Sequence, residues 1–422
     1  MFFYRSVRCF RPLHKAGDKF ARVFIVPCSS SVRDGGDEYE RGNQKREKGE
    51  GEQYDYHVPV MRDECCRYLL AGPFEEKGVF VDCTVGGGGH TKAILERGGK
   101  VIGFDQDPEA LAETSRKLSV YIESGQLELV HTNFRNIANA VRESKLAKEN
   151  GGVCNGILMD LGVSSHQINE PRRGFAFAAD GPLDMRMGGG RNLGTDVKNG
   201  EPWRSSSLTA ATICNEFMED DIANILYNYG DETRSRKLAR EIVAMRPIST
   251  TKELVEILSR VTPFKERTKI LARCFQALRI AVNDEMGALD KALEDAHKII
   301  RPGGRLVVLS YHSLEDRRVK RLIKTGKTKS DYSHKAISYC SPWNSVFKKV
   351  QTPTQHEIEK NSRARSAKLR VAERISVGEE LTQGHVFLGS TSFGKKNKYK
   401  TGIIGNKEKR KAVARGDIED EF

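Results

Sequence analysis

The chain has 422 residues, 38% of them apolar, and a formal net charge of +13. This length exceeds one typical domain, and the apolar fraction is sufficient for a globular core. No apolar run approaches the roughly 18 residues that a membrane-spanning helix needs. The nine cysteines include no Cys-x-x-Cys pair, so we expect reduced thiols and no metal site. The positive charge favours a polyanionic partner such as RNA, although both termini contribute to the excess.

Residues 1–34 have the composition of an organellar transit peptide. Arg5, Arg8 and Arg11 share one side of a helical wheel, and aromatic and aliphatic residues share the other. A basic terminus without a targeting role is the alternative. Residues 35–56 are polar and without pattern, which predicts a linker. We therefore expect import into the mitochondrial matrix, with a plastid as the alternative.

A strand, a glycine turn and a helix are predicted in succession from residue 79. The largely apolar residues 79–83 lead into four glycines at 86–89, and a helical pattern follows at once. A second strand at residues 101–104 ends in Asp105, about 20 residues after the first glycine. Such a loop brings backbone N–H groups against a nucleotide-like ligand, and the carboxylate can accept ribose hydroxyls. Asp82 suits a ligand with an ammonium group, which favours S-adenosylmethionine over a dinucleotide; a turn without any ligand is the alternative.

The rest of the chain predicts an α/β core with an inserted helical subdomain. Strands are expected at 79–83, 101–104, 127–131, 156–160 and 305–311, the last after a helix at 285–300 and a turn at 301–304. Helical spacing marks residues 220–229, 235–245 and 252–261, with a capping box at Thr250 and Glu253. We expect a mobile loop at 188–207 and irregular structure after residue 324.

Three polar residues are candidates for chemistry. Asp160 ends the fourth strand, where ligands of open α/β sheets bind, although it could instead cap the next turn. Asp184 lies in a loop motif that contains both acidic and basic residues. His312 follows the fifth strand, where a buried histidine that only makes structural hydrogen bonds is an equal alternative. Residues 315–318 are charged and could also act at the site, but it is an equal alternative that they simply begin a solvated helix.

These motifs, taken together, resemble the small-subunit ribosomal RNA methyltransferase H (MraW) family. The resemblance covers residues 57–374 and rests on the ordered motifs at 57–61, 82–90, 105–108, 158–165, 173–177, 180–187, 275–280, 313–317 and 361–370. It implies a Rossmann-like, S-adenosylmethionine-dependent methyltransferase core. The import-type N-terminus resembles that of a mitochondrial member.

The residue patterns and the resemblance together predict a domain plan, and the resemblance also implies a set of site residues. The expected segments are a transit peptide (1–34), a linker (35–56), the first part of the core (57–164), a helical substrate-binding insert (165–275), the second part of the core with the C-terminal motif (276–374) and a basic disordered tail (375–422). Residues implied to contact the cofactor are Gly88, Gly89, His90, Asp105, Phe134, Asp160 and Gln167. Asp160 and Asp184, with His312 behind them, are the candidates at the reacting amino group.

The implied activity is methylation of the exocyclic N4 of a cytosine in the decoding region of mitochondrial small-subunit rRNA. The expected partner is that rRNA or the assembling small subunit, without a membrane and with a homodimer as an option. The basic groups expected to contact RNA are Arg234, Arg236, Lys237, Arg240, Arg363, Arg365 and Arg370. A nucleotide-dependent dehydrogenase and a catalytically idle RNA-binding assembly factor are the alternatives.

Overall fold

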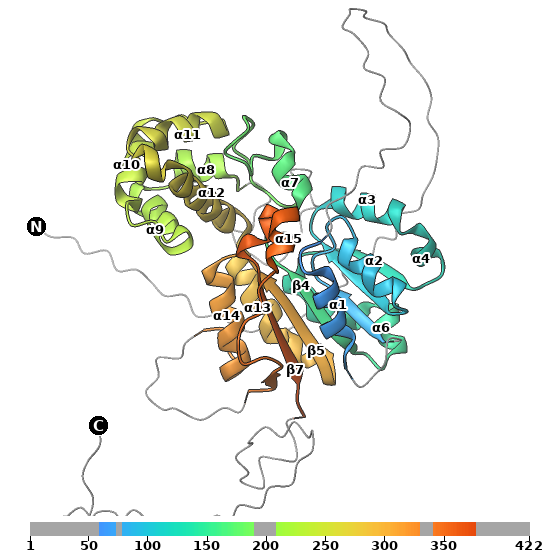
Figure 1. The fold of residues 1–422 in the computed structure, drawn as a ribbon. Coiled ribbons are helices and arrows are strands. Elements are labelled where there is room, and N and C mark those ends of the chain that lie inside the picture. The colour runs from blue at the N-terminus through green and yellow to red at the C-terminus, as the bar shows by residue number, and fades with distance from the viewer. Residues whose placement is uncertain (1–58, 73–77, 190–207, 330–340, 377–422) are drawn as a thin grey trace, which may run out of the picture. The chain divides into compact units, whose positions relative to one another are not determined.

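The computed structural model describes residues 59–72, 78–189, 208–329 and 341–376 (Figure 1). Expectations for residues 1–58, for most of the loop at 188–207 and for the tail from 377 lie outside these ranges. No helix of the described residues is long and apolar enough to cross a membrane. The six cysteines within the described ranges are all buried and free, in agreement with the expected thiols.

One seven-stranded sheet forms the centre of the fold, with strand order β3-β2-β1-β4-β5-β7-β6. The strands are β1 (Val79–Asp82), β2 (Lys100–Asp105), β3 (Leu127–His131), β4 (Cys154–Asp160), β5 (Ile300–Ser310), β6 (Trp343–Ser345) and β7 (Lys368–Arg374). The first five strands of the chain pair in parallel, and β7 pairs antiparallel with β5 and β6. The predicted parallel α/β sheet is confirmed.

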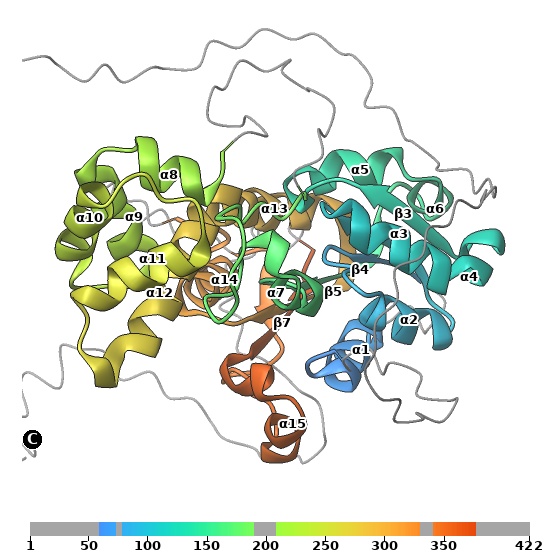
Figure 2. The same cartoon turned by 90° about the horizontal axis from the view of Figure 1, so that it is seen from above.

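Helices cover both faces of this sheet, which explains the continuous apolar strands. Successive residues point to opposite faces: Val81 packs in one core cluster, and Phe80 packs in the other. Helices α1 (Arg62–Leu70) and α2 (Gly89–Glu96) contribute to the cluster of Phe80. On the other face lie α5 (Ile137–Glu143), α6 (Lys145–Glu149), α13 (Glu285–Ile299) and α14 (Ser313–Thr325), as Figure 2 shows from above.

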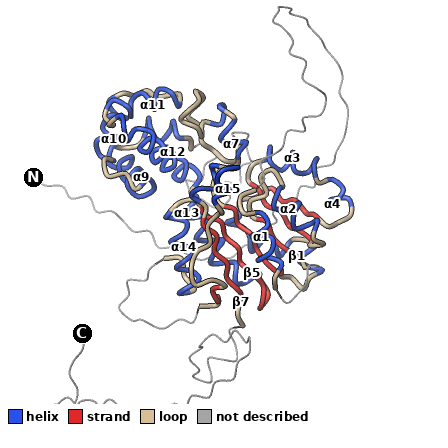
Figure 3. The backbone as a smooth tube through the Cα atoms, viewed as in Figure 1, coloured by secondary structure: helices blue, strands red, loops and turns tan. Residues whose placement is uncertain are grey.

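A helical segment with its own core lies between β4 and β5 in sequence. Its helices are α8 (Ala210–Glu216), α9 (Glu219–Gly230), α10 (Ser235–Ala244), α11 (Thr251–Arg260) and α12 (Arg267–Asn283). Figure 3 shows helices and loops there, and no strand is assigned to the described residues 208–283. Leu226, Leu254 and Leu278 are fully buried in a cluster separate from those of the sheet. Helix α12 continues across residue 275, where we expected the insert to end, because its apolar face extends to Leu278 and beyond.

Shorter helices complete the described chain. They are α3 (Pro108–Lys117), α4 (Ser119–Glu123), α7 (Ser165–Asn169) and α15 (Gln355–Lys360), together with short 3-10 helices that include Phe134–Asn136 and Pro171–Arg173. Helix α7 begins with a capping box formed by Ser164 and Gln167. The predicted capping box of Thr250 and Glu253 at the start of α11 is confirmed.

Two expectations about the C-terminal half are wrong. The predicted turn at 301–304 lies inside β5, where a register shift against β4 and the positive φ of Gly303 accommodate the glycines. The chain after residue 324 is not irregular, because β6, α15 and β7 follow. In β7 the residues Leu369 and Val371 are buried against β5, although charged neighbours obscure this alternation in the sequence.

Candidate active site

A large cavity opens at the carboxyl ends of the parallel strands. Its volume is about 1050 Å³, and residues that follow β1, β2, β4 and β5 line it together with parts of α12 and α13. The lining includes all seven positions implied to contact the cofactor: Gly88, Gly89, His90, Asp105, Phe134, Asp160 and Gln167. This edge of a parallel sheet is where ligands of such folds bind. The structure therefore brings residues from distant parts of the chain to one site.

The glycine loop after β1 is held in shape by a buried carboxylate. Asp82 accepts hydrogen bonds from the Thr84 backbone N–H (3.1 Å) and the Thr91 hydroxyl (2.6 Å). Asp82 is 1% exposed and is not part of the cavity lining, so our suggestion that it meets an ammonium group of the ligand is wrong. Gly88 ends the loop with φ +80°, and a Cβ on Gly89 would lie 2.3 Å from Pro59 Cγ. Glycine is required at both positions.

Asp105 lies at the end of β2 and lines the cavity beside the loop. Its Oδ2 accepts from the Gly86 N–H and its Oδ1 from the Asp107 N–H, both at 2.8 Å. Burial raises the pKa of Asp105 to about 6, although these two N–H groups act to lower it. Each oxygen keeps a further lone pair, so the carboxylate can accept two hydroxyls from a ligand.

Phe134 and Gln167 occupy different parts of the cavity wall. Phe134 begins a 3-10 helix whose cap is Asn133, and its partly buried ring packs against the sheet core. Gln167 donates to Asp107 Oδ2 (3.1 Å) and to the Met187 carbonyl (3.4 Å), and its Oε1 accepts from the Ser164 N–H. Phe134 offers an aromatic wall for a flat ring, whereas Gln167 mainly joins segments of the chain.

A buried ion pair that was not predicted from the sequence supports this wall. Arg173 donates to Asp107 Oδ2 at 2.8 Å and to the Met187 carbonyl at 2.8 Å, and both charged side chains are at most 6% exposed. The pair ties the loop after β2 to the segment after α7. Its signal in the sequence was the position of both residues inside the motifs at 105–108 and 173–177, which we had not assigned a structural role.

Asp160 ends β4 and lines the cavity. Its Oδ1 accepts from the Tyr311 hydroxyl at 2.7 Å, and its Oδ2 lies 3.6 Å from His90 Nδ1. Burial raises the pKa of Asp160 to about 7, against the lowering effect of the Tyr311 hydrogen bond. Burial also lowers the pKa of His90, so this contact joins a neutral imidazole to the carboxyl group. Asp160 can thus exchange a proton near neutral pH.

Asp184 does not line this cavity. Its Oδ1 accepts from the backbone N–H and Nε of Arg186, and its Oδ2 accepts from Nη2 at 2.6 Å. Burial acts to raise the pKa of Asp184, but the hydrogen bonds and charge of Arg186 leave it below the ordinary value. The carboxylate is engaged by its neighbour two residues along the chain, and the structure does not bring it together with Asp160 at the cavity.

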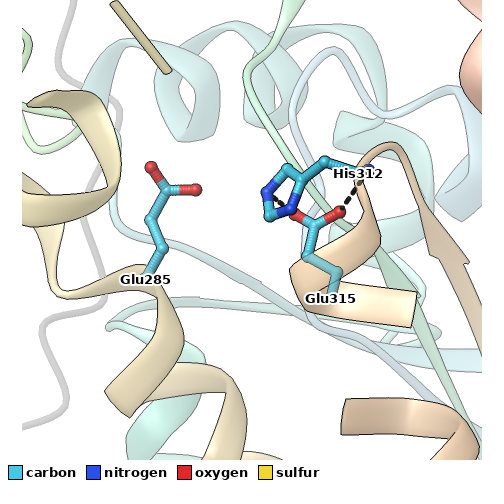
Figure 4. Close-up of side chains that lie close together, drawn as sticks. All are labelled: Glu285, His312 and Glu315. Atoms are coloured by element: carbon cyan, nitrogen blue, oxygen red, sulfur yellow. Dashed lines mark hydrogen bonds and ion pairs between the residues drawn. The ribbon is translucent and has the colours of Figure 1, made fainter. Parts of the chain in front are cut away.

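His312 lines the cavity within a cluster of charged residues (Figure 4). Its Nε2 lies 3.0 Å from Glu315 Oε1, and Glu315 is buried rather than part of a solvated helix start. Burial acts to raise the pKa of Glu315, but His312, the Tyr311 N–H and Arg279 together hold it below the ordinary value. Glu285 faces this pair across the cavity, and Arg279 binds both of its oxygens at 2.8 and 3.0 Å.

The cluster of Glu285, His312 and Glu315 has ligand atoms within 4.8 Å of one another, a spacing that could suit a cation. Arg279 already pairs with Glu285, and His312 lies 3.0 Å from Glu315, so we assign no metal to it. Neither Arg279 nor Glu285 was predicted as a site residue from the sequence. A single charged residue in the otherwise apolar stretch 277–282 was the available signal for Arg279.

The comparisons with known proteins agree with this geometry. The MraW methylase family matches residues 55–375 of the chain. A ribosomal RNA small subunit methyltransferase H from Heliobacterium modesticaldum is 42% identical over 334 residues, covering 76% of this chain and 99% of that protein. Proteins with the same name from Brevibacillus brevis and Bacteroides fragilis are 41% and 40% identical, each across 76% of this chain and at least 98% of their own length.

The chain belongs to the MraW methylase family. The predicted membership is therefore confirmed, and the chain is a methyltransferase whose cofactor is S-adenosylmethionine. The alternative of a nucleotide-dependent dehydrogenase is wrong.

The residues of the cavity fit this cofactor. Asp105 offers free acceptor positions for ribose hydroxyls, Phe134 offers a wall for the adenine ring, and the backbone of the glycine loop borders the same space. When bound, S-adenosylmethionine supplies an electrophilic methyl group on a sulfonium. The cavity volume of about 1050 Å³ leaves room for an acceptor beside Asp160.

Proposed function

We propose that this methyltransferase acts on the exocyclic N4 of a cytosine in the decoding region of mitochondrial small-subunit rRNA. The observation that carries the proposal is Asp160, a carboxyl group with a pKa raised to about 7 at the cavity wall. An exocyclic amine must lose a proton when it gains a methyl group. The carboxylate form of Asp160 accepts that proton and holds the amino group in place.

Methylation of the ring carbon of cytosine would need a nucleophilic thiol. The two candidate thiols, Cys83 and Cys154, do not suit this role. Cys83 lines the cavity, but burial raises the pKa of its thiol well above the ordinary value. Burial raises the pKa of Cys154 to about 12. A neutral, buried thiol is a poor nucleophile. Transfer to an exocyclic amine needs a proton acceptor and a fixed base instead.

The remaining polar groups of the cavity could form hydrogen bonds with an unstacked cytosine base. A cytosine presents amino donors and the N3 and O2 acceptors on one edge. Arg279 and His312 provide donors, and Asp160 and Glu285 provide acceptors, on the wall of the same cavity. A base can enter this site only from a single-stranded or locally opened RNA.

The choice of rRNA and of the organelle has separate support. The relatives carry the name ribosomal RNA small subunit methyltransferase H and match almost their whole length. The Arg-rich, acid-poor residues 1–34 support import into the mitochondrial matrix, and a plastid is the alternative. The partner would be the rRNA itself or the assembling small subunit; a homodimer stays a prediction.

Comparison of organellar small-subunit rRNA from cells with and without the protein tests this proposal. We expect one cytosine to lose its N4-methyl group when the protein is removed, and to regain it on re-expression. An unchanged modification pattern would instead favour a catalytically idle assembly factor.

A further inference from the structure

A second, smaller cavity shares helix α14 with the active-site cavity. Its volume is about 410 Å³, and it is lined by residues of α9, residues of α14 and the segment after α14. Four of its nine lining residues are Arg or Lys and one is acidic, so the cavity carries a net positive charge. The nine lining residues are Tyr227, Asn228, Asp231, Leu314, Arg317, Arg318, Arg321, Thr328 and Lys329. Its composition favours an anionic ligand.

Two of these cations keep most of their hydrogen-bonding capacity. Arg317 Nε donates to the Ser313 carbonyl, and Arg321 Nη1 donates to the Thr328 carbonyl. Neither guanidinium forms an ion pair with a carboxylate of the described chain. Arg318 differs, because its Nε lies 3.1 Å from Asp290 Oδ1. Each guanidinium has five N–H donors, so Arg317 and Arg321 can still bind phosphate oxygens.

An exposed aromatic ring belongs to the same cavity. Tyr227 on α9 is 59% exposed, whereas Ile222 and Leu226 of the same helix are buried. An accessible ring beside unpaired guanidinium groups is the combination that proteins use for single-stranded nucleic acids, because a base stacks on the ring while cations bind the backbone.

Helix α14 contributes residues to both cavities. His312, the N-cap of α14, and Glu315 line the active-site cavity, whereas Arg317 and Arg321 line the second. From His312 to Arg321 the helix rises by about 13 Å. The Ser313 hydroxyl donates to Asp231 Oδ2 at 3.3 Å, which joins the start of α14 to the end of α9.

Several cations that the sequence had suggested for RNA are already engaged. Arg234 pairs with Glu266 at 2.6 Å, and Arg370 pairs with Asp316 at 2.6 Å. Arg363 donates to the Asn169 side chain. Their contribution to phosphate binding is therefore reduced.

We propose that this second cavity binds the backbone of the single-stranded RNA that flanks the target base. Arg317 and Arg321 bind phosphates, and Tyr227 stacks on a neighbouring base. This inference rests on the proposed function, since it assigns a path to the RNA that enters the active site.

Salt-dependent binding of a short, fluorescein-labelled single-stranded RNA to the full-length protein tests the proposal. In the double variant Arg317→Gln/Arg321→Gln, the slope of log affinity against log salt should fall by roughly 1.4, about 0.7 for each lost phosphate contact. Tyr227→Ala should weaken binding roughly 5- to 100-fold, whereas Tyr227→Phe keeps the ring and should bind as the parent does. All variants should keep the parent affinity for S-adenosylmethionine, which shows that they fold.

A matched control removes the same charge elsewhere. Arg142 and Lys148 are exposed on α5 and α6 and do not line either cavity, so Arg142→Gln/Lys148→Gln should keep the parent slope. An equal fall in slope in both double variants overturns the inference. So does an unchanged slope in Arg317→Gln/Arg321→Gln. A parent protein that neither binds nor methylates RNA refutes the proposed function instead.

Discussion

At the scale of single residues, Asp160 decides how the activity should depend on pH. Its ordinary pKa of 3.8 is raised to about 7 by burial, and the carboxylate form is the proton acceptor. The rate of methylation should therefore rise with pH through about 7 and level off above it. Tyr311→Phe removes a hydrogen bond that lowers this pKa, so the midpoint should move to higher pH.

The pH–rate profiles of the parent and Tyr311→Phe provide the measurement, and Tyr121→Phe, outside the cavity, provides the control. A profile in Tyr311→Phe identical to that of the parent would show that Asp160 does not control the titration.

Asp105 gives a second prediction at this scale, on binding rather than on rate. Asp105→Asn loses the negative charge and part of the acceptor capacity toward ribose hydroxyls. Binding of S-adenosylmethionine should weaken by about 1–3 kcal/mol. Titration calorimetry measures this change, with Asp63→Asn as a control because Asp63 is exposed and outside the cavity. Equal affinities of parent and Asp105→Asn would disprove the ribose contact.

These two carboxylates could be predicted from the sequence because each ends a strongly apolar parallel strand. The direction of the strand alone then places the side chain at the ligand edge of the sheet. The position of the Asp184 side chain could not be predicted in this way, because its loop has no regular geometry. Its carboxylate instead accepts hydrogen bonds from Arg186. Arg279 and Glu285 escaped notice because only tertiary packing brings α12 and α13 beside His312.

At the scale of elements, the capping box of α11 makes a prediction about stability. The Thr250 hydroxyl accepts from the Glu253 N–H, and Glu253 accepts from the Thr250 N–H. Thr250→Ala leaves an N–H group at the helix start without its partner. The free energy of unfolding should fall by about 0.5–2 kcal/mol, and Thr250→Ser should lose little. Urea unfolding measures the difference, and a stability of Thr250→Ala equal to that of the parent would rule out this contribution.

Elements with long apolar periodicity were predictable, and those that depend on a partner strand were not. Helices α9, α10 and α11 each bury one face, and the sequence shows their spacing directly. Strand β7 alternates buried residues with charged ones, and it becomes a strand because the edge of β5 accepts it. The glycines at 303 and 304 predicted a turn, but they lie within β5, in the register shift between the pairings of Ile300 and Arg305 with β4.

At the scale of the whole molecule, the N-terminal segment should be separable from catalysis. The described fold begins at residue 59, and residues 1–50 should carry a fluorescent protein into mitochondria when fused to it. A matched fusion in which Arg5, Arg8 and Arg11 are changed to Gln should stay in the cytosol. Diffuse fluorescence of the unaltered fusion would contradict the localisation and leave the chemistry untouched.

Mass spectrometry of nucleosides from small-subunit rRNA treated with the protein and S-adenosylmethionine tests the central claim most directly. We predict N4-methylcytidine as the product, its loss in a folded Asp160→Asn variant, and its retention in Cys83→Ser and Cys154→Ser. A product of 5-methylcytidine or of a methylated ribose, or full activity of Asp160→Asn, would contradict the account.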